Sequence, residues 1–319
     1  MAEDLSVKVA LPDWYRDLVA PHLDGARAAW YADGEAALKA LPKADAFWFE
    51  LWGRRQVEFA ELLEAGRKLR WIQTSAAGVE SLDLQALAAR EVTLTNGAGL
   101  HAAPIAEHVV MCMLAARRNL LDMLRAQAER RWDRRMAGSD ELGEARVLIL
   151  GYGLIGRAIA RRARALGAEV TGARRRGRGG RGVVVGDSWR ALLPESDFLV
   201  VSAPLTPATR GIVGTAELQA LKPGAWVVNI ARGPLIDEAA LLDALGGGRL
   251  GGAALDVFDN EPLPADHPLW KQPNVILTPH VSASTNRLRP RAAELFLDNL
   301  GRFRAGRRLL NVVDLRAGY

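Results

Sequence analysis

The sequence predicts an α/β protein with two doubly wound parallel-sheet domains. Three observations lead to this prediction. Short apolar segments alternate with helical patterns along most of the 319 residues, which is typical of strand–helix–strand units. The segment 147–150 ends directly in a glycine-rich turn at 151–156, and a helical pattern follows that turn. An amphipathic pattern at 291–304 follows the last apolar segment and could return the chain to the first domain.

The first domain contains four predicted strands. They cover residues 6–11, 45–50, 69–74 and 92–96, and helical patterns lie between them at 56–66 and 82–89. Because strands alternate with helices, we expect the strands to form a parallel sheet that is covered on both faces.

The second domain opens with a long predicted helix at about 104–121. Ile105, Val109, Met113 and Leu114 recur at helical spacing, and Pro104 suits a first helical turn. A polar segment at 127–144 leads into the strand at 147–150, and further predicted strands cover 168–173, 196–202, 225–230, 252–257 and 274–278. We therefore expect a domain of residues 99–287, inserted into a discontinuous domain of residues 1–98 and 288–319.

Composition narrows the class of protein. The chain is 49% hydrophobic and 25% charged, which is ordinary for a globular domain. The single cysteine, Cys112, excludes an intrachain disulfide, and no signal sequence or run of 18 apolar residues is visible. We expect a cytoplasmic protein with no membrane partner and no metal site. The net charge of +5 raises the possibility of nucleic-acid binding, but charges of both signs occur throughout and we expect no nucleic-acid partner.

The turn Gly151-Tyr-Gly-Leu-Ile-Gly156 has the spacing of a dinucleotide-binding turn. Gly151 permits a tight turn, Gly153 lets the backbone approach a pyrophosphate, and Gly156 lets helix and strand pack closely. Leu154 and Ile155 begin the helix, whose free N–H groups can bind phosphate. Residues 99–287 are thus predicted to be a Rossmann coenzyme domain.

Arg174, Arg175 and Arg176 stand where this fold usually places an acid that binds the ribose 2′-hydroxyl. An acid would repel a 2′-phosphate, whereas a guanidinium can bind one in a bidentate manner. This pattern predicts a preference for NADP(H), with NAD(H) possible. The alternative is an exposed basic loop with no role in cofactor choice.

Three candidate catalytic residues stand just beyond the ends of successive predicted strands. Arg232 follows the strand at 225–230, Glu261 follows the strand at 252–257, and His280 follows the strand at 274–278. Because the carboxyl ends of parallel strands line the ligand crevice, we expect these residues to converge. Taken singly, each could instead be a surface cation, a turn residue or a buried structural histidine.

The chain resembles the D-isomer-specific 2-hydroxyacid dehydrogenases over about residues 45–290. The matching stretches are Ser75-Ala-Ala-Gly-Val-Glu80, Ala106-Glu107, Gly151-Tyr-Gly-Leu-Ile-Gly156, Pro204-Leu-Thr-Pro-Ala-Thr-Arg210, Asn229-Ile-Ala-Arg-Gly-Pro-Leu-Ile-Asp237, Leu255-Asp-Val-Phe-Asp-Asn-Glu-Pro262 and Thr278-Pro-His280. The resemblance implies a Rossmann domain inserted into a flavodoxin-like substrate domain. It also implies a homodimer formed through the helix near 104–121.

Reduction of a 2-keto acid needs a hydride at the carbonyl carbon, a proton at its oxygen and a clamp for the carboxylate. Arg232 suits the clamp because its planar fork fixes orientation. His280 is the expected proton donor, since an imidazole can give and take a proton near neutral pH. Glu261 would orient the imidazole and stabilise its protonated form.

The resemblance implies further contacts. The cofactor would be contacted by Pro204, Thr209, Ala231, Asp256 and Ala283, with the Asp256 carboxylate on the nicotinamide amide, and the substrate carboxylate by the amides of Ala77 and Gly78. The aromatic segment Phe47-Trp-Phe-Glu-Leu-Trp52 corresponds to the loop that faces the substrate side chain in the family. Trp48 and Trp52 would then fill much of the pocket, which favours a small substrate such as glyoxylate or hydroxypyruvate. Packing of these aromatics in the core is the alternative.

The favoured function is therefore an NADP(H)-dependent oxidoreductase for a small 2-keto or 2-hydroxy acid. A dehydrogenase for a bulkier keto acid remains an alternative within the family. A cofactor-sensing binding protein, like the corepressors that share this fold, is an alternative from another class, and nucleic-acid binding through 174–181 is a third. Turnover of NADPH with a keto acid would distinguish either dehydrogenase from the cofactor-sensing protein.

Overall fold

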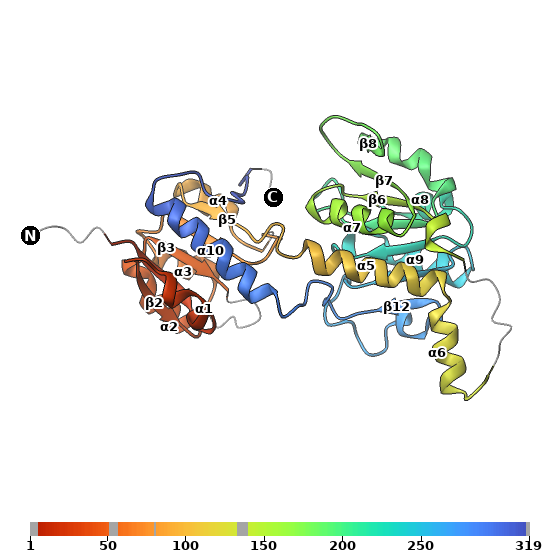
Figure 1. Ribbon diagram of the computed structural model, residues 1–319, viewed down its shortest axis with the longest axis horizontal. Coiled ribbons are helices and arrows are strands. Elements are labelled where there is room, and N and C mark those ends of the chain that lie inside the picture. Colours follow the sequence, from red (N-terminus) through yellow and green to blue (C-terminus); the bar gives the residue numbers. More distant parts are fainter. Residues whose placement is uncertain (1–5, 51–56, 80, 133–139, 317–319) are drawn as a thin grey trace, which may run out of the picture. The chain divides into compact units, whose positions relative to one another are not determined.

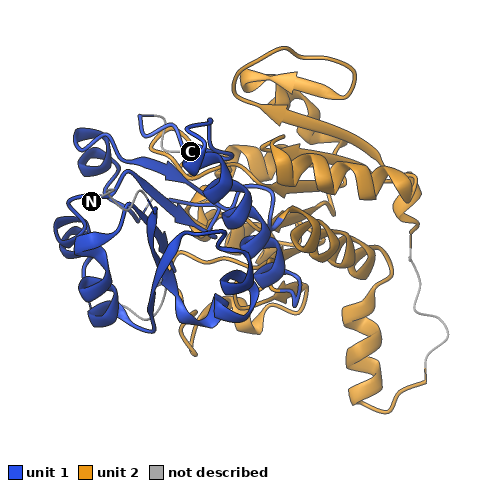
Figure 2. Ribbon diagram, turned by 60° about the vertical axis from the view of Figure 1, so that its left-hand side comes forward, with its two compact units in different colours: residues 1–101, 285–319 blue, residues 102–284 orange. Residues whose placement is uncertain are grey.

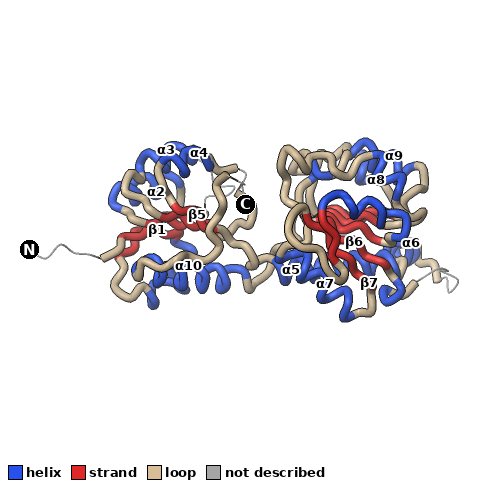
Figure 3. Tube along the Cα trace, turned by 90° about the horizontal axis from the view of Figure 1, so that it is seen from above, coloured by secondary structure: helices blue, strands red, loops and turns tan. Residues whose placement is uncertain are grey.

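The computed structural model describes residues 6–50, 57–79, 81–132 and 140–316. The chain forms two compact units, one of residues 1–101 and 285–319 and one of residues 102–284 (Figure 2). Each unit contains one parallel sheet with helices on both faces, as Figures 1 and 3 show. The α/β class with two parallel sheets is thus confirmed. The units divide close to the boundaries expected from the sequence, 1–98 with 288–319 and 99–287.

The first unit is a five-stranded sheet in the order β2-β1-β3-β4-β5, which is the flavodoxin-like order. Its strands are β1 (Lys8–Pro12), β2 (Arg27–Tyr31), β3 (Ala46–Phe49), β4 (Trp71–Thr74) and β5 (Thr93–Thr95), and its helices are α1 (Arg16–Val19), α2 (Gly34–Ala40), α3 (Phe59–Ala65), α4 (Leu84–Ala89) and α10 (Leu288–Arg304). Figure 3 shows α2, α3 and α4 on one face and α10 on the other. Side chains alternate accordingly, so Phe47 packs with the first group and Trp48 with Phe296 of α10.

The second unit is a seven-stranded sheet in the order β12-β11-β10-β9-β6-β7-β8. Its strands are β6 (Arg146–Leu150), β7 (Glu169–Arg174), β8 (Val183–Val185), β9 (Phe198–Val201), β10 (Trp226–Asn229), β11 (Gly252–Leu255) and β12 (Val275–Leu277), and its helices are α5 (Ala102–Arg117), α6 (Leu120–Ala128), α7 (Leu154–Ala165), α8 (Thr215–Ala220) and α9 (Glu238–Gly246). The strand order reverses between β6 and β9. In a doubly wound sheet this reversal marks the crevice where a dinucleotide binds.

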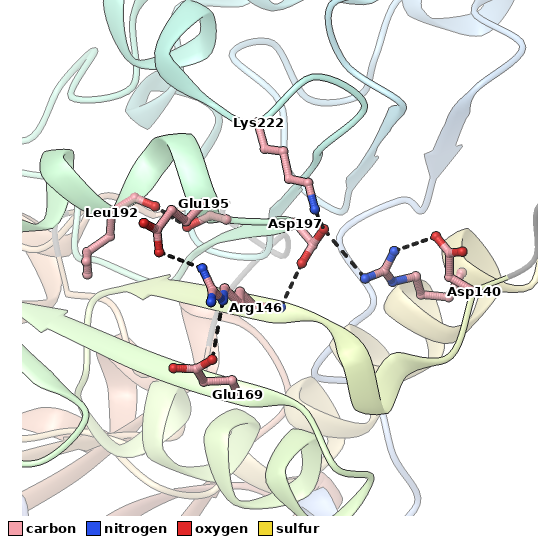
Figure 4. A network of polar contacts seen from close by, with 9 residues as sticks. Asp140, Arg146, Glu169, Leu192, Glu195, Asp197 and Lys222 are labelled. Carbon is pink, nitrogen blue, oxygen red and sulfur yellow. Dashed lines mark hydrogen bonds and ion pairs between the residues drawn. The ribbon is translucent and has the colours of Figure 1, made fainter.

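Polar contacts connect the N-terminal ends of neighbouring strands in the seven-stranded sheet (Figure 4). Asp197 accepts hydrogen bonds from the Arg146 amide and from Lys222 Nζ, both at 2.8 Å. Arg146 also pairs with Glu195 at 2.6 Å. Burial raises the pKa of Asp197, but these hydrogen bonds and the nearby Arg117 charge outweigh burial and lower it overall. This network stabilises the edge that lies away from the strand carboxyl ends.

One expected helix is in fact two. The predicted helix at 104–121 ends at Arg117, and a separate helix, α6, begins at Leu120. Asn119 between them has φ +50, a left-handed conformation that asparagine tolerates better than most residues and that interrupts a right-handed helix. The sequence prediction of one continuous helix was therefore wrong. Within the described residues, no helix is long and apolar enough to cross a membrane.

Candidate active site

The glycine-rich turn has the geometry that its sequence predicts. Gly151 has φ +103, and a Cβ there would lie 2.4 Å from the Ala203 amide nitrogen, so only glycine fits. A Cβ on Gly156 would lie 2.3 Å from the Gly151 carbonyl oxygen, whereas nothing lies within 4 Å of a Cβ on Gly153. Gly151 and Gly156 thus permit close packing, and Gly153 borders open space that a pyrophosphate could occupy.

The N-terminus of α7 is exposed to the same space. Gly153 is its N-cap and offers no side chain to the first amides of the helix, which belong to Leu154 and Ile155. Free N–H groups together with the helix dipole favour an anion at this position. These residues fit a dinucleotide, and the predicted contacts remain predictions.

The three arginines after β7 lie in different surroundings. The Arg174 guanidinium donates to the Arg178 carbonyl, so it is folded onto its own loop. Arg175 and Arg176 are exposed. Arg174 therefore braces the loop, while the next two arginines face solvent.

Three neighbouring strands place the candidate catalytic residues. Asn229 at the end of β10 is paired with Leu255 of β11, which is paired with Leu277 of β12. Arg232, Glu261 and His280 each follow one of these strand ends, at the carboxyl edge of the sheet. The shared edge expected from the sequence is therefore present.

The loop that carries Arg232 is fixed by Asn229, which is buried. Asn229 Nδ2 donates to the Arg232 carbonyl at 2.9 Å, and its Oδ1 accepts from the Ala231 amide at 3.1 Å. Arg232 itself donates to the Ala231 carbonyl at 2.6 Å. A Cβ on Gly233 would lie 2.1 Å from the Phe258 carbonyl carbon. Glycine at this position lets the Arg232 loop pack directly against the loop that leads to Glu261.

Glu261 and His280 form a direct pair. His280 Nδ1 lies 2.7 Å from Glu261 Oε2, and Glu261 Oε1 accepts a hydrogen bond from the Phe258 amide at 3.0 Å. With a proton on Nδ1, Nε2 of the imidazole is left for another group. About half of the His280 side-chain surface is exposed, so the imidazole is open to a ligand. This geometry is that of an acid or base oriented by a carboxylate.

Asp256 directly follows β11 and is 1% exposed. Its Oδ1 accepts from Thr278 Oγ1 at 2.6 Å and from the Val281 amide at 2.9 Å, and its Oδ2 accepts from the Ser282 amide at 2.8 Å. These bonds hold residues that precede and follow His280 in the chain. His280 itself has a left-handed φ of +54. A carboxylate has about four acceptor positions, so among the described residues one position on Oδ2 is left for the predicted contact with the nicotinamide amide.

The remaining predicted cofactor contacts lie on the same unit. Thr209 Oγ1 donates to the Pro204 carbonyl at 2.7 Å and accepts from the Thr206 amide at 2.8 Å, so this loop is held by its own side chain. Ala283 is partly buried and packs against the core beneath the sheet. Among the described residues, no group of three or more His, Cys, Asp or Glu side chains is arranged to hold a metal ion.

In the other unit, the loop after β4 contains the predicted carboxylate-binding residues. The Gly97 amide donates to the Ala76 carbonyl at 2.8 Å, and Asn96 Nδ2 donates to the Ala77 carbonyl at 2.7 Å. Within the part of the chain that the structure describes, the amides of Ala77 and Gly78 donate to no protein acceptor. The Ala76 and Ala77 carbonyls belong to the same peptide groups as these two amides, and both are held by hydrogen bonds. Two successive amides oriented in this way suit an anion.

The predicted place of Trp48 in a substrate pocket is corrected by the structure. Trp48 is 0% exposed and stacks on Phe296 at 4.8 Å between ring centroids. Its Nε1 donates to Glu50 Oε1 at 2.9 Å and lies 3.2 Å from Ser75 Oγ. Because β3 is central in its sheet, both of its faces are buried and Trp48 belongs to the core. Trp52 lies outside the described residues.

Sequence reasoning missed several residues that shape these loops, above all Glu50, Asn96, His101 and Asn229. Each is a polar residue at or just after the end of a buried strand, or at the start of a helix. That position could have identified them, since buried polar side chains at such points usually bind backbone groups of a neighbouring loop.

A known family model matches more than half of the chain. Residues 110–282 match the model of the D-isomer specific 2-hydroxyacid dehydrogenase, NAD binding domain. The chain belongs to the D-isomer specific 2-hydroxyacid dehydrogenase family. The family resemblance seen in the sequence is thus confirmed.

Two solved structures cover nearly the whole chain. A family member from Aeromonas salmonicida subsp. salmonicida A449 is 34% identical with a TM-score of 0.85, covering 97% of this chain and 99% of that one. An NADPH-dependent glyoxylate/hydroxypyruvate reductase from Sinorhizobium meliloti, in complex with NADP and sulfate, is 29% identical with a TM-score of 0.83, covering 98% and 100%. A D-3-phosphoglycerate dehydrogenase from Archaeoglobus fulgidus is 33% identical over 80% of this chain. This chain spans about half (49%) of that protein's length.

Proposed function

We propose that this protein reduces a small 2-keto acid to the 2-hydroxy acid with NADPH, or carries out the reverse oxidation. The observation that carries the proposal is the Glu261–His280 pair, whose 2.7 Å contact stands at the same sheet edge as Arg232. An acid or base oriented by a carboxylate beside a guanidinium suits a substrate that has a carboxylate next to a carbonyl.

Each group then has a distinct task. His280 gives its Nε2 proton to the carbonyl oxygen during reduction, and Glu261 stabilises the histidine before that transfer. Arg232 binds the carboxylate and the carbonyl oxygen together, because its planar fork fixes their orientation. The Ala77 and Gly78 amides bind the substrate carboxylate. Bound NADPH would supply the hydride.

The preference for NADPH rests on the loop after β7. Arg175 and Arg176 are exposed at the position where this fold contacts the adenosine ribose, and no described residue places an acid there. Arg174, which is folded onto the loop, would hold the other two in place. The NADP complex of the Sinorhizobium meliloti reductase supports this choice.

Glyoxylate and hydroxypyruvate are the substrates that we favour. The name of the Sinorhizobium meliloti reductase supports them, whereas the Archaeoglobus fulgidus relative is named for a phosphorylated substrate. A dehydrogenase for a bulkier keto acid is the second candidate, because Trp48 lies in the core and does not narrow a pocket.

We also propose that the active form is a homodimer. Exposed apolar side chains gather on α5 and α6, namely Met111, Leu114, Leu120, Met123 and Leu124. Exposed apolar side chains that form a contiguous patch are a common feature of protein interfaces, and these five lie on two consecutive helices. Light scattering coupled to size-exclusion chromatography should give a mass near twice 34.6 kDa, and a monomer at micromolar concentration would reject this part of the proposal.

The direct experiment is a spectrophotometric screen of keto acids with NADPH and NADH in parallel. We expect turnover of glyoxylate and hydroxypyruvate, with kcat/KM for NADPH at least about tenfold above that for NADH, which corresponds to one charge-assisted contact. The double variant Arg175→Ser, Arg176→Ser should lose this preference. Equal or better rates with NADH in the parent would reject the cofactor assignment, and binding of NADPH without turnover would instead favour the sensor.

A further inference from the structure

The loop that carries the Ala77 and Gly78 amides begins with Ser75, whose backbone is held at both its amide and its carbonyl. The Ser75 amide donates to Glu50 Oε1 at 2.6 Å. The Ser75 carbonyl accepts from His101 Nε2 at 2.7 Å. Glu50 directly follows β3 and His101 directly precedes α5, so two separate elements hold the two peptide groups on either side of the Ser75 Cα.

Glu50 is itself held rigidly. Its Oε1 also accepts from Trp48 Nε1 at 2.9 Å, and its amide donates to Tyr31 Oη at 3.2 Å. Tyr31 Oη in turn donates to the Trp48 carbonyl. The carboxylate therefore has a fixed place against the Ser75 amide, which makes it a rigid support for the loop.

The charge of Glu50 is unfavourable at this place. Burial raises the pKa of Glu50, although the hydrogen bonds from Ser75 and Trp48 oppose the rise. A negative charge close to amides that await a carboxylate also weakens anion binding. A buried acid that is unfavourable for both reasons is expected to have a structural role. The hydrogen bond from the Ser75 amide indicates that role.

We propose that Glu50 is a positioning residue, which holds the Ser75 amide and so orients the loop whose Ala77 and Gly78 amides bind the substrate carboxylate. His101 completes the support from the carbonyl side. This inference rests on the proposed function, because it takes the keto acid to be the ligand of these amides. Since the carboxylate is bound before and during hydride transfer, loss of the support acts mainly on KM.

The test compares Glu50→Leu, which removes the acceptor, with Glu50→Gln, which keeps an amide oxygen for Ser75 and Trp48. For the leucine variant we expect the KM for glyoxylate to rise roughly tenfold, the effect of one lost hydrogen bond, with little change in kcat or in the KM for NADPH. The glutamine variant should stay within about threefold of the parent. Asp33→Ala is the matched control, because Asp33 also accepts a backbone amide hydrogen bond, from Ala36 at 2.8 Å, at the start of α2.

A second variant guards against misfolding of the first. His101→Leu removes the other support of Ser75 and should raise the same KM alone. An unchanged glyoxylate KM in Glu50→Leu and His101→Leu, with circular dichroism like that of the parent, would overturn the proposal. A glutamine variant as impaired as the leucine variant would overturn the role of the acceptor. A parent that turns over no keto acid would instead reject the proposed function.

Discussion

Glu261 holds His280 with one carboxylate oxygen and its own loop with the other. The 2.7 Å contact to His280 Nδ1 and the 3.0 Å hydrogen bond from the Phe258 amide leave the carboxylate little freedom to turn. A carboxylate fixed in this way keeps a proton on Nδ1, so that Nε2 is the nitrogen that gives the transferred proton in reduction and takes it in oxidation. The pair is therefore prepared for proton transfer before any ligand binds.

Loss of the proton donor should affect kcat more than binding. We expect His280→Ala to lower kcat for keto-acid reduction by about 10²–10⁴-fold, and Glu261→Gln to lower it less, because the imidazole remains. Steady-state kinetics with saturating NADPH measures both. His267→Ala is the matched control, since His267 pairs with Glu238 at 3.0 Å outside the candidate site and its loss should leave kcat unchanged. Near-native kcat in His280→Ala would rule out the proton-transfer assignment.

Asp256 should act through the loop that carries His280. In Asp256→Asn the side-chain NH2 group would face the Ser282 amide. Both groups are hydrogen-bond donors, so the bond from Ser282 would be lost. We expect kcat to fall roughly 10–100-fold, because small misplacement of a catalytic group is costly. The KM for NADPH should rise by a smaller factor than the factor by which kcat falls. A large rise in that KM with kcat intact would favour a role confined to the nicotinamide contact.

Gly233 should be intolerant of any side chain. A Cβ there would lie 2.1 Å from backbone of the Glu261 loop, so Gly233→Ala must separate that loop from Arg232. We expect kcat/KM to fall at least about 100-fold. Gly246→Ala is the control, because a Cβ at the end of α9 meets nothing within 4 Å and alanine favours helix. Similar kcat/KM values for the two variants would contradict this reading of the loop contact.

The Asp197 network predicts a defined pH dependence of stability. Since the pKa of Asp197 is lower in the folded protein than in the unfolded chain, its stabilising effect is full at neutral pH and is lost as pH falls below about 4. Asp197→Asn should therefore lower the free energy of unfolding at pH 7 and approach the parent value at acidic pH. Denaturant titrations across this range measure the difference. Glu169→Gln, which breaks only an exposed 3.4 Å ion pair with Arg146, should have little effect at either pH, and a penalty for Asp197→Asn that grew with acidity would contradict the account.

The buried strands could be predicted from the sequence because a strand covered on both faces is apolar throughout, as in Phe198–Val201. Two edge strands were not predicted. Arg27–Tyr31 alternates between exposed and partly buried positions over most of its length, and Val183–Val185 is an apolar run of only three residues after an arginine- and glycine-rich loop. The break at Asn119 was missed because its helical neighbours on both sides continue the same apolar spacing.

The candidate site was predictable only where strand ends bring residues to a shared edge. Arg232, Glu261 and His280 follow that rule. Trp48 does not, because the aromatic pattern at the end of a strand cannot tell a pocket from a core, and the packing of α10 against β3 decides it. Glu50 and His101 meet at Ser75 from positions about fifty residues apart, and no local pattern in the sequence reports such a contact.

The most direct test of the central claim is the rate of NADPH oxidation with glyoxylate, measured side by side for the parent and His280→Ala. We predict steady-state oxidation by the parent, a stronger rate than with NADH, and loss of at least about 99% of kcat in the variant. Tight binding of NADPH by the parent without oxidation by any 2-keto acid would contradict the account.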